Sequence, residues 1–328
     1  MKKIFIAILA AATIASCSNE DTVNVDNGAL IGFGKVFVEN STRANDLAAG
    51  NFDFGVYGLV EKDGNNALIF DNQKVAADGT YSPAQYWIAA AQYYFTAIAP
   101  KTNANWNYAT TTAHTGTITF NNEHAAANQD LLFAYVKPNA TPEQITSDPG
   151  AVGFTFNHML SRVRFTFTNG FGAGSNIKLE VKDVTITDAY ASAELTVANG
   201  TPAEAWSNFG TTLFSKNFGQ VGGATLATLT DVGTTMSAST EHLYLIPANK
   251  AYNVTFTVDL YQAGVKLDTY SRTATIPATE MKSGMSYDIK TTLTANNTSD
   301  DGKLYPIEFK VTGVKGWDTY NEVTGTVN

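Results

Sequence analysis

The sequence predicts an all-β protein made of two tandem antiparallel β-sandwich domains. The chain of 328 residues is rich in Thr and contains 19 Phe and 15 Tyr, residue types that favour strands. Short apolar runs recur between turn signals such as Asp78-Gly79, a spacing typical of sandwiches. Beyond a turn or two around residues 84–91, no segment has convincing helical periodicity.

The first 16 residues have the features of a lipoprotein signal peptide. Lys2 and Lys3 precede an apolar run over residues 4–14, which is too short to span a bilayer as a helix. The sequence Ile14-Ala15-Ser16-Cys17 resembles the bacterial lipobox, in which the cysteine is acylated and becomes the mature N-terminus. The alternative is an ordinary secretory peptide followed by an incidental cysteine. Because Cys17 is the only cysteine, we expect no disulfides and a fold that relies on its core.

Residues 17–43 are expected to form an acylated tether and a removable N-terminal strand. Residues 29–38 are apolar on both faces, as in a strand that is buried on both sides. If about five of its six large apolar side chains are buried, they contribute roughly 8–15 kcal/mol. That is comparable with the net stability of a whole domain, about 5–15 kcal/mol. The six side chains are Leu30, Ile31, Phe33, Val36, Phe37 and Val38.

A protease site is expected directly after this strand. Residues 40–46 are polar and favour a loop, in which Arg43 should be accessible. A trypsin-like protease would then cut between Arg43 and Ala44. The alternative is that Arg43 is an ordinary surface residue.

The remaining chain divides into an N-terminal sandwich over residues 44–157 and a C-terminal sandwich over residues 158–328. The strongest strand pattern spans residues 152–167, where Val163, Phe165 and Phe167 alternate with polar residues. This alternation predicts one apolar face and one polar face. Other predicted strands cover residues 52–59, 67–70, 93–100, 115–120, 130–136, 184–186, 193–197, 243–247, 253–260, 306–311 and 314–317.

The sequence contains no convincing catalytic or metal-binding motif, so we expect neither an enzyme nor a cofactor. None of the four histidines has a paired metal-ligand spacing, and no nucleophile elbow occurs. A spacing like that of a calcium loop, over residues 297–308, fits a loop between strands better. His158 is expected to be a packed or hydrogen-bonded structural residue. The net charge of −9 without basic clusters argues against a nucleic-acid partner.

Several short motifs, taken together in their order, resemble the fimbrillins, subunits of type V pili on Gram-negative anaerobes. They include an arginine cleavage site behind a lipobox and an aromatic strand that ends in proline. They also include a D-hydrophobic-A motif and an F-x-H-x-L-x-[KR]-V strand. The corresponding residues are Thr42-Arg43-Ala44, Trp87 with residues 94–100, residues 130–134, residues 154–165 and Trp317.

This resemblance implies two transthyretin-like β-sandwich domains without catalysis, and a mechanism of assembly. The precursor would reach the outer membrane as a lipoprotein through Cys17, and an Arg-specific protease would remove the N-terminal strand at Arg43. A strand from a neighbouring pilus subunit would then fill the vacated groove. A receptor on a host or bacterial surface would be a further partner. Whether the chain is a stalk, tip or anchor subunit stays open.

Two other functions compete with this one. The chain could be an outer-membrane-anchored surface lipoprotein that binds glycans without polymerising, using exposed aromatic residues. Aromatic residues at this density are more often part of the core. A secreted hydrolase is a third alternative, but no nucleophile or metal constellation supports it. The tryptophans available for stacking on sugars are Trp87, Trp106, Trp206 and Trp317.

Overall fold

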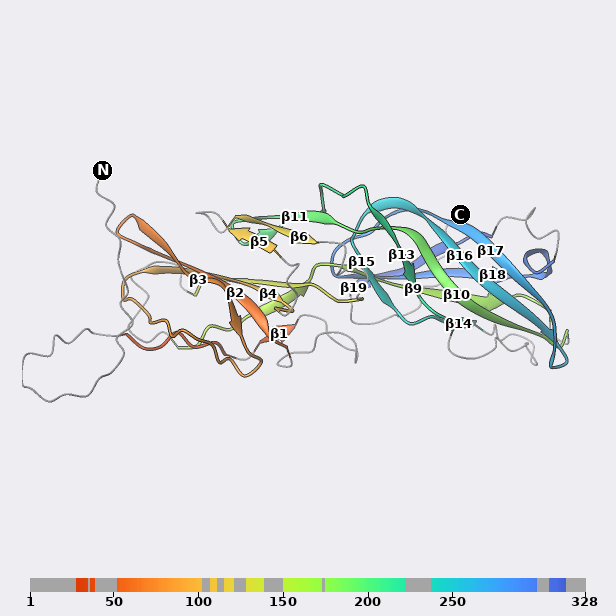
Figure 1. Cartoon of the computed structure of the whole chain (residues 1–328), viewed down its shortest axis with the longest axis horizontal. Coiled ribbons are helices and arrows are strands. Elements are labelled where there is room, and N and C mark those ends of the chain that lie inside the picture. The colour runs from red at the N-terminus through yellow and green to blue at the C-terminus, as the bar shows by residue number, and fades with distance from the viewer. Residues whose placement is uncertain are drawn as a thin grey trace, which may run out of the picture.

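The computed structural model describes residues 28–34, 36–38, 52–101, 107–110, 115–120, 128–138, 150–172, 175–221, 237–299 and 307–316. Four β-sheets form two sandwiches. The two sandwiches lie end to end along the longest axis of the molecule (Figure 1). Within these ranges the helical structure is limited to a 3₁₀ turn at Ala295–Asn297. The predicted all-β fold is therefore confirmed. No helix in the described part of the chain is long and apolar enough to cross a membrane.

The N-terminal sandwich consists of a six-stranded sheet packed against a four-stranded sheet. In spatial order the first contains β1 (Phe37–Val38), β8 (Thr155–His158), β7 (Leu132–Val136), β4 (Gln92–Ala99), β2 (Phe54–Lys62) and β3 (Asn65–Val75). The second contains β12 (Thr201–Pro202), β11 (Ala193–Ala198), β6 (Gly116–Phe120) and β5 (Asn107–Thr110).

Strands from beyond residue 157 complete this N-terminal sandwich. β11 pairs in antiparallel fashion with β6, which places Leu195 opposite Ile118. Both side chains are fully buried in one apolar cluster with Phe133 of β7. Hydrogen bonds therefore cross the sequence-based division of the chain. The division at residue 157 stays a prediction.

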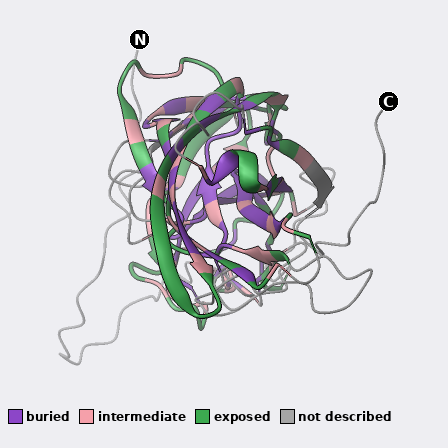
Figure 2. Ribbon diagram, turned by 90° about the vertical axis from the view of Figure 1, so that its right-hand side faces the viewer, coloured by how far each residue is buried: buried purple, intermediate pink, exposed green. Residues whose placement is uncertain are grey.

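In the C-terminal sandwich, a four-stranded sheet packs against a five-stranded sheet. The first sheet contains β13 (Leu213–Asn217), β10 (Ile177–Tyr190), β16 (Asn249–Gln262) and β17 (Val265–Glu280). The second contains β14 (Ser237–Ser239), β9 (Ser161–Asn169), β18 (Met285–Leu293) and β19 (Lys310–Gly316), with β15 (Leu243–Leu245) also paired to β9. Seen from this end of the molecule, buried residues lie inside and exposed residues outside (Figure 2).

The alternation predicted along β9 is confirmed. Val163, Phe165 and Phe167 are fully buried in the core of the C-terminal sandwich. The polar face is also covered in part, because Arg162 is fully buried and its Nε donates to Ser286 Oγ at 3.0 Å. Two pairs are exceptions to the otherwise antiparallel sheets: β9 with β18, and β1 with β8.

A short connection links the two sandwiches. β8 ends at His158 and β9 begins at Ser161, so Met159 and Leu160 alone separate them. The main-chain oxygen of Met159 accepts hydrogen bonds from Trp206 Nε1 at 3.0 Å and from Ser283 Oγ at 2.8 Å. Side chains from distant parts of the chain thus fix the backbone at this crossing.

Candidate functional site

The N-terminal segment, residues 28–34 and 36–38, lies on the face of the six-stranded sheet away from the second sheet, and its end pairs with β8. Its first part pairs with a flanking segment, residues 81–88, through an antiparallel bridge between Leu30 and Tyr86. Its later part runs parallel to residues 152–156, and Gly34 N donates to Val152 O at 2.8 Å. The segment is therefore hydrogen-bonded on both sides by main-chain groups.

Only one side of the N-terminal segment faces the core. Ile31, Phe33 and Val36 are buried, whereas Val38 is half-buried. Leu30 is 52% exposed and Phe37 is 60% exposed. The expectation that about five of these six side chains are buried was therefore wrong, because Leu30 and Phe37 each lie next to a buried residue in an extended chain and point away from it. Three buried side chains contribute about 5–9 kcal/mol.

Phe33 occupies the centre of an aromatic cluster. Its ring is nearly parallel to that of Phe154, with centroids 5.9 Å apart, and the other four ring pairs meet edge to face. Those centroids lie between 5.3 and 6.4 Å from that of Phe33. We call this cluster the Phe33 socket; its walls are Phe54, Phe70, Tyr81, Phe95 and Phe154.

Two tyrosine hydroxyls hold the flanking segment in place. The Tyr81 hydroxyl donates to the main-chain oxygen of Ile31 at 2.6 Å and accepts a hydrogen bond from Gln85 N at 3.3 Å. Burial raises the pKa of Tyr81, so its hydroxyl keeps the proton that it donates. The Tyr93 hydroxyl accepts a hydrogen bond from Ile88 N at 2.7 Å. The flanking segment is thus tied both to the sheet and to the N-terminal segment.

Gly79 allows the main chain of the N-terminal segment to come close. A Cβ atom at this position would lie 2.5 Å from the main-chain oxygen of Phe33, which is closer than real contacts allow. Its φ of +86° is also in the region that favours glycine. Neither Gly79 nor Tyr81 was predicted from the sequence to contact the N-terminal segment. The turn signal Asp78-Gly79, followed closely by Tyr81 and Trp87, is the only sequence feature that could have pointed to them.

His158 is a structural residue, as predicted. Its Nδ1 lies 2.7 Å from a carboxylate oxygen of Asp130, and both side chains are almost completely buried. The pair joins β8 to the chain just before β7. No group of three or more potential metal ligands occurs among the residues that the structure describes.

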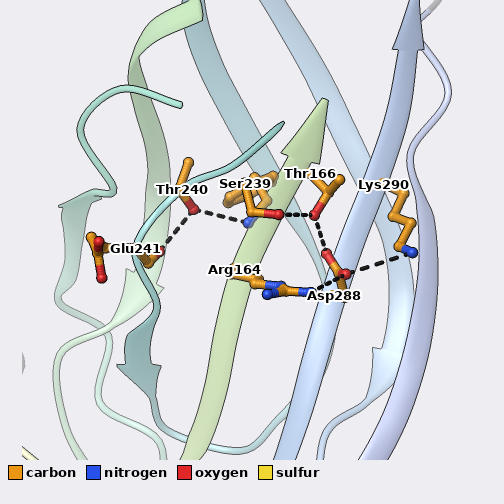
Figure 3. A network of polar contacts seen from close by, with 8 residues as sticks. Arg164, Thr166, Ser239, Thr240, Glu241, Asp288 and Lys290 are labelled. Atoms are coloured by element: carbon orange, nitrogen blue, oxygen red, sulfur yellow. Dashed lines mark hydrogen bonds and ion pairs between the residues drawn. The ribbon is translucent and has the colours of Figure 1, made fainter. Parts of the chain in front are cut away.

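A second polar cluster lies on the outer face of the C-terminal sandwich (Figure 3). The Asp288 carboxylate accepts hydrogen bonds from Thr166 Oγ1 at 2.6 Å and from Arg164 at 2.9 Å, and Lys290 Nζ lies 3.7 Å away. The Thr166 hydroxyl also contacts that of Ser239 at 2.7 Å. Since two cations and a hydroxyl surround this one carboxylate, the cluster ties β9, β14 and β18 together and resembles no catalytic arrangement.

Several residues that the sequence singled out lie outside the part of the chain that the structure describes. Cys17, Arg43 and Ala44 lie beyond the described residues, so lipidation and cleavage stay predictions. Trp106 and Trp317 also lie outside them. Trp87 and Trp206 are buried, so these two tryptophans belong to the core and are not available for stacking on sugars.

The fold and the bound N-terminal segment define a class of protein. The chain is a two-sandwich, all-β protein whose N-terminal sandwich is completed by a short segment at its edge. A family model described as fimbrillin-like matches residues 42–306, so the chain belongs to the fimbrillin-like family. It is therefore a fimbrial or adhesive structural protein of the cell surface and not an enzyme. The match begins at residue 42, so it does not include the N-terminal segment.

Solved structures to which this chain is similar include the following three. A candidate cell adhesion protein from Bacteroides uniformis is 18% identical, with a TM-score of 0.46, over 88% of this chain and 99% of that chain. A fimbrial assembly protein from Parabacteroides distasonis is 13% identical, with a TM-score of 0.39, over 87% and 96%. The fimbrial anchor protein Mfa2 from Porphyromonas gingivalis is 12% identical, with a TM-score of 0.30, over 88% and 97%. No curated protein matches the sequence. Family membership rests on the family model alone.

Proposed function

We propose that this protein is a pilus subunit that is exported as a lipoprotein, cut after Arg43 and polymerised by strand replacement. Acylation at Cys17 would attach the precursor to the outer membrane. An Arg-specific protease would then separate the N-terminal segment from the body of the protein. A strand of a neighbouring subunit would take the vacated place.

One observation carries this proposal: the N-terminal segment buries three apolar side chains in the cluster that covers the outer face of the six-stranded sheet. Ile31, Phe33 and Val36 are buried in the same cluster as the strands of the six-stranded sheet. The main-chain hydrogen bonds of the segment to residues 85–87 and 152–154 are ones that any extended chain can form. These bonds support the proposal that a foreign strand replaces the segment, because they do not depend on its side chains.

Loss of the segment would provide the driving force for assembly. Removing it exposes apolar side chains of the sheet and unpaired main-chain groups along residues 85–87 and 152–156. Such surfaces associate strongly with other extended chains. About 5–9 kcal/mol of burial would be lost until a new strand arrives. Cleavage would thus act as the switch from monomer to polymer.

An Arg-specific protease tests this proposal cleanly, because the chain contains only four arginines. Arg162 and Arg272 are buried, and Arg164 is half-buried within β9. Brief treatment of the folded protein without residues 1–16 should therefore cut after Arg43 alone. Mass spectrometry should show the released segment, and size-exclusion chromatography should show oligomers.

The matched control is Arg43→Gln, which removes the cleavage site and leaves every described residue unchanged. We expect this variant to stay intact and monomeric under the same treatment. A wild-type chain that is not cut, or that keeps its segment and stays monomeric after the cut, would contradict the polymerising function. That result would favour the anchored glycan-binding lipoprotein instead.

A further inference from the structure

We propose that the groove, the place occupied by the N-terminal segment, selects its incoming strand chiefly by one side chain, a phenylalanine that enters the Phe33 socket. The inference rests on the proposed function and names the kind of partner that this groove accepts. The partner is an extended segment with an aliphatic residue, a phenylalanine two positions later and a β-branched residue three positions after that. These positions correspond to Ile31, Phe33 and Val36.

The walls of the socket are already in contact with one another, so its shape is defined by more than its occupant. The rings of Phe70 and Tyr81 lie 5.2 Å apart, and those of Phe70 and Phe95 lie 6.1 Å apart. Phe54 contacts Phe154 at 5.7 Å. A smaller side chain at the central position would leave a cavity among five rings and would lose their edge contacts.

Other positions of the incoming strand are not selected in this way. A Cβ atom added to Gly32 or Gly34 would meet the Cβ of Ala151 at 3.8 and 3.5 Å, which is ordinary contact. Leu30 and Phe37 are exposed, so their side chains contribute little to recognition. The selective information is therefore concentrated on the buried side of the strand, and within it on Phe33.

Contacts to the main chain of the incoming strand determine which of its residues reaches the socket. The Tyr81 hydroxyl donates to the carbonyl two residues before Phe33, and Gly79 leaves room for the carbonyl of Phe33 itself. The strand must also pair in antiparallel fashion with residues 85–87 and in parallel with residues 152–154. A shift by one residue would turn the phenylalanine away from the core.

The test compares release of the N-terminal segment from three otherwise identical chains after the cut at Arg43. The chains are the wild type, Phe33→Ala and the matched control Phe37→Ala, whose side chain is exposed. The released fragment is followed by size-exclusion chromatography and mass spectrometry. We expect the Phe33→Ala segment to be lost at least about 100-fold faster than the wild-type segment. The Phe37→Ala segment should leave within about threefold of the wild-type rate.

A second measurement uses synthetic peptides of residues 28–38 and also covers a Phe33→Ala chain that fails to fold. Wild-type, Phe33→Leu, Phe33→Ala and Phe37→Ala peptides compete for the groove of the cut wild-type protein. We expect binding to weaken in the order wild type, Phe33→Leu, Phe33→Ala, with Phe37→Ala close to wild type. Equal binding of the wild-type and Phe33→Ala peptides would overturn selection by the socket while leaving strand replacement intact. Failure of every peptide, the wild type included, would overturn the proposed function.

Discussion

The hydroxyl of Tyr81 donates a 2.6 Å hydrogen bond to the main-chain oxygen of Ile31, fifty residues earlier in the chain. It is a side-chain hydrogen bond within an attachment otherwise made of main-chain bonds and apolar contacts. Because its acceptor is a main-chain oxygen, any strand that occupies the groove can accept it. The bond therefore strengthens attachment without reading the sequence of the occupant.

Replacing Tyr81 with phenylalanine should loosen the N-terminal segment while preserving the aromatic socket. The variant loses the hydrogen bonds to Ile31 and Gln85 but keeps the ring that packs against Phe33. We expect the free energy of unfolding to fall by about 1 kcal/mol, as measured by urea denaturation. Amide hydrogen exchange of residues 29–34 should become faster.

Tyr261→Phe provides the comparison for this variant. The Tyr261 hydroxyl donates to Glu180 at 2.9 Å on the C-terminal sandwich, far from the N-terminal segment in sequence and in fold. Hydrogen exchange of residues 29–34 should not change in this control. Equal acceleration in both variants would contradict a specific role of Tyr81.

The buried pair of Asp130 and His158 should be important for stability. Replacing Asp130 with alanine leaves the His158 ring buried without the carboxylate that lies 2.7 Å from its Nδ1. We expect the free energy of unfolding to fall by about 2–3 kcal/mol. Asp183→Asn is a suitable control, because Asp183 is exposed and asparagine accepts its positive φ of 56°. A change in Asp130→Ala no larger than in this control would refute the prediction.

Asp259 should make stability depend on pH in the acid range. Burial alone would raise the pKa of this carboxyl, but hydrogen bonds from Lys182, Lys266 and Thr269 outweigh burial and lower the pKa to about 2. The ordinary value is 3.8. As pH falls, the unfolded chain binds this proton first. The stabilisation is therefore present above about pH 4 and is lost between about pH 4 and pH 2.

Asp259→Asn isolates this effect, since asparagine does not titrate. At pH 5 the variant should be less stable than the wild type by about 1 kcal/mol, a figure reduced for solvent screening of the partly exposed lysines. Urea denaturation at pH 5, 4, 3 and 2 should show this difference shrinking toward zero. A difference that stays constant across the series would show that Asp259 does not titrate in this range.

A fragment that ends at residue 157 should fold poorly. It lacks β11 and β12, so β6 loses one of its two partners and keeps only β5. Ile118 and Phe133 lose part of their cover. Far-ultraviolet circular dichroism and urea denaturation should show a broad, weakly cooperative transition. If the fragment unfolds as sharply as the whole chain, the N-terminal sandwich does not need β11.

The sequence was sufficient to predict individual strands and to predict which side of the strongest strand is buried. Val163, Phe165 and Phe167 alternate with polar residues in the sequence and are fully buried in the structure. His158 likewise has the structural role that its position beside a strong strand indicated. The N-terminal segment was recognised as core because of its apolar residues, although half of its large side chains face outward or are only partly covered.

What the sequence could not provide depends on partners that are distant along the chain. The pairing of β11 with β6 joins segments more than seventy residues apart, and alternation alone does not reveal a strand's neighbour. The same pattern fits parallel and antiparallel pairing, so the parallel pair of β9 and β18 was not foreseen. The contact of Gly79 with Phe33 depends on an approach of two backbones, which leaves little trace in composition.

The two-residue connection between β8 and β9 also has a mechanical consequence. These strands run almost continuously from one sandwich into the other, along the longest axis of the molecule (Figure 1). Because β9 runs parallel to β18 over eight residue pairs, a tensile force along this axis would load their hydrogen bonds in shear. Those bonds would have to fail together and not one after another. A fibre of such subunits would then resist stretching through the middle of each C-terminal sheet.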